Sequence, residues 1–185
     1  MCGIVAGILV AQGCIERKPL QVAKKESPVT ARLAEMIESE RRLKDAPTTT
    51  PQGFQALNRK HRAEIYHFLA QAVIVMPEDL YAASEILGRA DVEAPDAILL
   101  AHHLAATAAD KGLDSARLKA AMLIDRYHAI IGRPQLYGTQ YITDSLGVPI
   151  LYPVDSSVSD SQRVAWGVQP LDSLRANLER SGGGK

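Results

Sequence analysis

Apolar residues recur every three or four positions along most of this chain, which is the spacing of an amphipathic helix. The segment 28–44 has this pattern, and Ser27 precedes it as a suitable cap. The stretch 45–53 (DAPTTTPQG) lacks any apolar period and predicts a linker. The pattern resumes over 54–76, so we expect a second helix there and place the start of the main domain near Phe54.

Two further predicted helices have the same start signal, a proline followed by acidic residues. They begin at Pro77 and Pro95. The second is followed by another helix that Asp114 or Ser115 should cap, so that residues 95–132 predict a helical hairpin. Small residues at its crossing positions favour close packing of the two helices: Ala101, Ala105, Ala108, Ala116, Ala120 and Ala121. This spacing is similar to that of tetratricopeptide-like repeats, and residues 54–88 would be a degenerate earlier copy.

Beyond Gly132 the apolar period shortens, and residues near 139–154 read as a small β-hairpin. Two short helices and a flexible tail at 181–185 would complete the chain. The predicted fold is therefore mostly α: antiparallel helical hairpins with a small C-terminal β-hairpin and short terminal helices. The helical domain, hairpin included, is expected over 54–180, preceded by a tether, a helix and a linker over 15–53.

Composition narrows the possible functions. Acidic and basic residues balance at 21 each, which argues against a nucleic-acid partner. Five histidines and two cysteines lack the spacing of a zinc site, and no glycine-rich phosphate-binding loop occurs. We therefore expect neither a metal nor a cofactor.

The opening, MCGIVAGILVAQGC, contains both cysteines and no charge. Its first four residues resemble the start of class II glutamine amidotransferases, in which a cysteine such as Cys2 attacks an amide. The Asn-Gly and Arg-Gly turns of that family do not occur in this chain. The run over 1–14 also resembles a bacterial lipobox, with lipidation at Cys14, although no basic residue precedes its apolar core. This second interpretation predicts a lipid-anchored envelope protein or a secreted one, attached to the membrane only through its N-terminus. A cytoplasmic protein with an apolar N-terminal segment is the alternative.

The most distinctive stretch is DRYHAIIGRPQLYGTQY, residues 125–141. Together with PEDLYAA, PDAILLAHHLAATAADKG and VAWGVQPLDSL, it resembles a family of uncharacterised bacterial proteins that often carry export signals. The resemblance covers Leu57 to Leu178 and implies architecture and export rather than an activity. Members carry Gln-His-Gly where this chain has Leu87, Gly88 and Arg89.

In this motif, Gly132 would end a helix and Pro134 would stiffen a turn, so a polar loop follows at 133–140. Polar residues of the motif are the candidates for binding a ligand or peptide, or for fastening the loop to the helices: Asp125, Arg126, Arg133, Gln135, Tyr137, Thr139 and Gln140. His128 lies three residues after Asp125, so the two could instead pair as a general base.

Taken together, these patterns favour a non-catalytic envelope or secreted protein whose helical surface binds a protein or peptide. The alternative is a small hydrolase-type enzyme built on Asp125, His128 and the loop 133–140. A flat, largely satisfied polar loop would favour the binding protein, whereas perturbed titration of His128 together with a concave pocket beside the loop would favour the enzyme.

Overall fold

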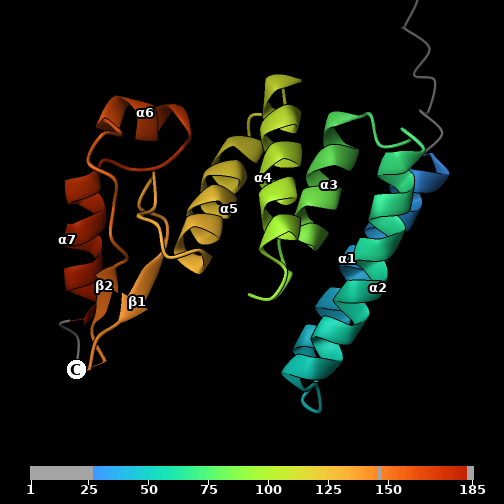
Figure 1. Ribbon diagram of the computed structural model, residues 1–185, viewed down its shortest axis with the longest axis horizontal. Helices are drawn as coiled ribbons and strands as arrows, with labels where there is room; N and C mark the ends of the chain where they lie inside the picture. The colour runs from blue at the N-terminus through green and yellow to red at the C-terminus, as the bar shows by residue number, and fades with distance from the viewer. Residues whose placement is uncertain (1–26, 146, 183–185) are drawn as a thin grey trace, which may run out of the picture.

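The computed structural model describes residues 27–145 and 147–182. Cys2 and Cys14, on which the predictions for the N-terminus depend, lie outside these residues. The described elements, in chain order, are α1 (Pro28–Asp45), α2 (Pro51–Ala70), α3 (Pro77–Leu87), α4 (Pro95–Asp110), α5 (Ala116–Ile130), β1 (Tyr141–Thr143), β2 (Pro149–Leu151), α6 (Asp160–Ala165) and α7 (Leu171–Gly182). The predicted mostly α fold with a small β-hairpin is confirmed. Helices α1 and α2 overlap at one end of the view, α3, α4 and α5 follow in order across the molecule, and the hairpin, α6 and α7 lie beyond α5 (Figure 1). None of the described helices is both long and apolar enough to cross a bilayer.

Capping residues explain where the helices begin. A proline occupies the first turn of each of the helices α1 to α4, where its missing N–H costs nothing. The Ser27 hydroxyl accepts a hydrogen bond from the Thr30 amide at 3.1 Å, and Thr50 caps α2 through the Gly53 amide at 3.0 Å. Because Thr50 and Pro51 supply a complete start signal, α2 begins three residues before the predicted position at Phe54.

Two helix ends also differ from the sequence-based expectation. Helix α2 ends at Ala70 rather than just before Pro77, because Ala72 takes a left-handed conformation with φ of 54°. The Val73 amide then bonds to the Phe68 carbonyl at 3.2 Å, as in a Schellman motif. Helix α7 continues to Gly182, two residues into the predicted tail.

The hydrophobic core lies among α3, α4 and α5, where small side chains face one another. Ala101, Ala105 and Ala120 are completely buried in it. Gly88 permits the closest approach, because a Cβ there would lie 2.6 Å from Leu123 Cδ2. The alanine-rich pairing expected between residues 95 and 132 is therefore the centre of the fold.

Helix α1 belongs to this same core, which corrects the expectation that the main domain starts near Phe54. Leu33 and Met36 are fully buried in the cluster that contains the α3 and α4 residues. Arg32 also holds Glu64 of α2 through two hydrogen bonds of 2.8 and 2.9 Å. The stretch 45–53 is thus a connection inside one domain, not a boundary between two.

The β-hairpin is short and antiparallel. Tyr141 faces Leu151, Ile142 faces Ile150 and Thr143 faces Pro149. Gly147, with φ of 81°, lies in the turn. Side chains alternate between the two faces of a strand, so Tyr141 and Leu151 share one face and the two isoleucines share the other.

Candidate functional site

Asp125 organises the loop that follows α5. Its carboxylate is fully buried and accepts four hydrogen bonds from the loop. The amides of Leu136 and Tyr137 donate to Oδ1 at 2.7 and 2.9 Å. The amide and hydroxyl of Thr139 donate to Oδ2 at 2.9 and 2.8 Å. Both carboxylate oxygens are therefore occupied by groups of the protein itself.

Gln135 fastens the same loop to the hairpin. Its side chain is completely buried, and its Nε2 donates to the carbonyls of Gln140 and Tyr152, both at 2.8 Å. Its Oε1 accepts from the Gln140 amide at 2.7 Å. A buried amide with all these bonds fixes the path of the chain on both sides of it.

Arg163 is a residue of this site that the sequence analysis missed. Only 2% of its surface is exposed, and its guanidinium donates to the carbonyls of Tyr137 at 3.2 Å, Leu136 at 3.4 Å and Val158. Asp125 thus takes the loop amides while Arg163 takes the loop carbonyls. From the sequence, Arg163 looks like an ordinary surface charge on a short helix. It lies 26 residues from Tyr137, and no sequence pattern links the two.

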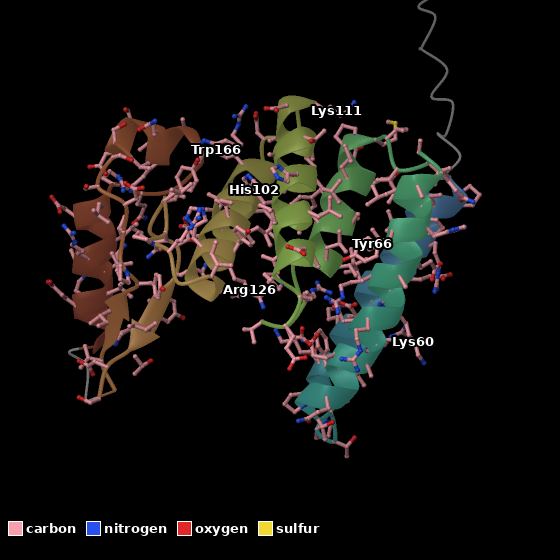
Figure 2. All side chains as sticks on the ribbon, viewed as in Figure 1. Lys60, Tyr66, His102, Lys111, Arg126 and Trp166 are labelled. Carbon is pink, nitrogen blue, oxygen red and sulfur yellow. The ribbon has the colours of Figure 1, made fainter. Side chains whose placement is uncertain are left out.

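Arg126, in contrast, lies apart from the loop. Its guanidinium donates to the carbonyls of Gly88 and, at 2.6 Å, Ala90. Figure 2 shows it beside the segment that joins α3 to α4. Burial lowers the pKa of Arg126, and the charge of Asp91 opposes that shift. Arg126 therefore ties α5 to the end of α3, which corrects its assignment to the loop.

The remaining motif residues lie around the loop. Arg133 is exposed. The Tyr137 ring packs 5.8 Å from the Trp166 ring, centroid to centroid, and burial raises the pKa of its hydroxyl. Gln140 Nε2 donates to the Met122 carbonyl at 3.3 Å. Of this group, Tyr137, Thr139 and Gln140 are held by α5 or α6, and Arg133 alone projects its side chain into solvent.

The predicted pairing of Asp125 with His128 does not form. His128 Nδ1 lies 2.8 Å from the Pro134 carbonyl, which can only accept, so Nδ1 carries the hydrogen. The Asp125 oxygens face the loop instead. A carboxylate that orients a general base must contact the imidazole, so the alternative hydrolase loses its central pair.

A shallow groove of about 390 Å³ lies beside the anchored loop, and we call it the hairpin groove. Helix α5, the hairpin and α7 provide its apolar walls: Leu118, Met122, Tyr141, Leu151, Leu174 and Leu178. Leu118 and Met122 are each 43% exposed and Tyr141 is 64% exposed. Large apolar side chains gathered in a hollow and left open to solvent are typical of a surface that binds another molecule.

A second polar cluster, also missed from the sequence, lies between α1 and α2. Glu40 is fully buried, and its Oε1 lies 2.8 Å from His61 Nδ1 and accepts from Asn58 at 3.1 Å. Its Oε2 accepts from Arg89 at 3.0 Å. Glu40 and Arg89 also line a cavity of about 440 Å³ with Phe54. Through these contacts Glu40 fastens α1 to α2 and to the residues that follow α3.

Comparisons with protein-family models, with curated proteins and with solved structures gave no match to this chain. Within the described residues, the geometry separates an internally satisfied polar loop from the open, apolar hairpin groove beside it.

Proposed function

We propose that this protein is a non-catalytic binding protein of the bacterial envelope, and that it holds an extended segment of a partner protein along β1 and the hairpin groove. The observation that carries the proposal is the free edge of β1 next to exposed apolar side chains. An extended peptide that joins a sheet edge gains affinity from its backbone and specificity from alternate side chains.

The ladder of the hairpin indicates which backbone groups are free for a peptide. The Tyr152 amide bonds to the Gln140 carbonyl at 3.1 Å and the Asp144 amide bonds to the Val148 carbonyl at 2.9 Å. Hydrogen-bonded pairs alternate along an antiparallel ladder, so the N–H and C=O groups of Tyr141 and Thr143 point away from β2.

The outer edge of β2 is a poorer template for a peptide. Pro149 occupies this edge opposite Thr143 and has no N–H to donate. Only β1 therefore offers a complete alternation of donors and acceptors, which directs the peptide to β1.

The groove supplies the apolar part of the binding energy. Leu118 and Met122 project from α5, and Tyr141 projects from the hairpin into the same hollow. Complete burial of one such side chain is worth about 1.5–3 kcal/mol. Alternate side chains of an added strand point toward one face, so we expect the bound segment to carry apolar residues at every second position.

The engagement of the buried polar side chains of the loop also favours binding over chemistry. Asp125 and Gln135 use their polar atoms to hold the loop. His128 donates from Nδ1 to the Pro134 carbonyl, which leaves Nε2 as an acceptor but without the Asp125 carboxylate that would orient a general base. The loop is better suited to present β1 in a fixed position than to transfer protons.

A library of random dodecapeptides displayed on phage tests the proposal directly. We expect panning against the full chain to enrich peptides with alternating apolar residues. Met122→Glu should weaken the best synthetic peptide at least about tenfold. The matched control is Ile150→Glu on the opposite face of the hairpin, where exposure is 44% against 43% for Met122, and it should retain the affinity.

Backbone chemistry separates strand addition from simple apolar contact. N-methylation of every second residue removes all amide hydrogens from one edge of an extended peptide. A peptide whose methylated edge must face β1 cannot pair with it. We expect one methylation pattern to abolish binding and the other to leave it intact. Failure to enrich any peptide, or equal losses in the Met122 and Ile150 variants, would contradict the proposed site.

The envelope location is proposed from the sequence context of Cys14, where VAQGC follows an apolar run. Metabolic labelling with palmitate in a bacterial host should mark the wild-type chain and leave Cys14→Ser unlabelled. Recovery of an unlabelled wild-type protein from the cytosol would refute the anchor without affecting the peptide site.

A further inference from the structure

The loop between α2 and α3 exposes three apolar side chains together, and we call them the α2–α3 tip: Val73, Val75 and Met76. They are 39%, 55% and 38% exposed. Ile74, between them, is only 6% exposed and belongs to the core. The segment is thus held by one side chain while its neighbours project outward.

The tip lies at the end of the molecule from which α1 starts. Helices α1 and α2 are antiparallel, because Arg32 pairs with Glu64 whereas Glu40 pairs with Asn58. The start of α1 therefore lies beside the end of α2 and the tip that follows it (Figure 1).

The chain that precedes α1 indicates what covers this apolar surface. Residues 15–26 join Cys14 to Ser27, and a chain of that length spans at most about 45 Å. A lipid on Cys14 would therefore keep the start of α1, and the tip beside it, close to the bilayer. Tethering of this kind raises the effective concentration of a weak second contact.

We infer that the α2–α3 tip inserts into the outer part of the lipid bilayer and so orients the anchored protein. This inference rests on the proposed anchor at Cys14. The tip itself carries no cation, and Glu78 is exposed just beyond Met76, so insertion of the tip does not draw on attraction to anionic headgroups. Insertion should depend on the apolar side chains and change little with the fraction of anionic lipid.

The orientation has a consequence for the partner. The tip follows α2 at one end of the row of helices, whereas the hairpin and α7 lie beyond α5 at the other end (Figure 1). The hairpin groove is lined by α5, the hairpin and α7, so it lies at that other end. Insertion of the tip would therefore leave β1 clear of the membrane and available to an extended segment.

The test attaches the full chain to vesicles chemically, so that it does not depend on lipidation in a cell. Cys14 is coupled to a maleimide lipid in a Cys2→Ser, Trp166→Phe background, and Val75→Trp supplies the only indole. The control places it at an exposed valine of α6 instead, through Val164→Trp, where exposure is 57%. Circular dichroism of both variants verifies that the fold is retained.

Brominated phosphatidylcholine quenches indoles that reach the acyl chains. We expect quenching of the Val75→Trp protein to exceed that of the Val164→Trp protein at least about twofold, with little change when phosphatidylglycerol is added. Equal quenching at the two positions, or none at either, would overturn the inference. A Val75→Trp indole already shielded from acrylamide before vesicles are added would also overturn it, because another part of the chain would then cover the tip.

Discussion

Replacement of Asp125 by alanine should destabilise the protein strongly, because one carboxylate holds most of the polar loop. The change removes four hydrogen bonds of 2.7–2.9 Å. It leaves the amides of Leu136, Tyr137 and Thr139 without their acceptor. A hydrogen bond to a charged group contributes about 1.5–3 kcal/mol, so full additivity would give about 6–12 kcal/mol.

The expected loss is smaller than that sum, because the loop residues are only partly buried and their amides can reach water after a small shift. We therefore expect Asp125→Ala to lower the free energy of unfolding by about 3 kcal/mol. For a domain of this size, this corresponds to a melting temperature about 6–12 °C lower. Asp125→Asn should lose nearly as much, because its NH₂ group would face two of the four loop donors whichever oxygen it replaces.

Urea unfolding at neutral pH, followed by circular dichroism, measures this loss. Asp172→Ala is the matched control, since the Asp172 side chain is 94% exposed in a surface pair with Arg175 and should contribute less than about 0.5 kcal/mol. A loss below about 1 kcal/mol for Asp125→Ala would refute the structural role of the loop contacts. The loop would then have to be reconsidered as a binding or catalytic site.

The expected effects of three further substitutions on stability follow from backbone conformation and side-chain burial. Gly88→Ala should cost about 1–3 kcal/mol in urea unfolding, because its Cβ would meet Leu123 at 2.6 Å. Gly53→Ala, at an exposed position, should cost clearly less, because its Cβ would meet only the Thr50 hydroxyl, at 3.2 Å; equal effects would contradict the close approach at Gly88. Ala72→Gly should stabilise by about 0.5–1 kcal/mol, since glycine adopts the φ of 54° freely, and a lower melting temperature would be the contrary result. Burial lowers the pKa of His102, partly offset by its bond to a backbone carbonyl. The unfolded chain therefore takes up that proton first, and stability should fall as pH drops below about 6.5. His102→Gln should lose less stability between pH 7.5 and 5.5, and an unchanged slope would contradict the assignment.

Much of the fold was predictable because its signals are local. Ser27 with Pro28, and the glycines after α4 and α5, mark helix limits through their own backbone requirements. The β-hairpin was predictable for the same reason, since alternation and a turn glycine lie within a few residues. Asp125 and Gln135 could be singled out because they belong to one continuous motif.

The errors concern contacts between segments far apart in the chain. Arg163 reaches the loop from another helix, and Glu40 is buried because Asn58 and Arg89 approach it from elsewhere. Glu40 follows Leu33 and Met36 at helical spacing, which was the one available signal of its burial, whereas Arg163 lies in a short helix without such a stripe. Because those contacts cannot be seen in the sequence, residues 28–44 were interpreted as a helix outside the main domain and residues 45–53 as the linker before it. Arg126 was assigned to the loop by its sequence neighbours, although its side chain points toward the end of α3.

The central claim is that β1 offers its free edge to an extended peptide, and hydrogen exchange of two amides tests it most directly. The amides of Tyr141 and Thr143 point away from β2, so in the free protein they should exchange rapidly with solvent. Saturation with a peptide selected by panning should slow exchange at both positions, while the core amides of α4 change little. Binding of that peptide without protection of Tyr141 and Thr143 would contradict strand addition at β1.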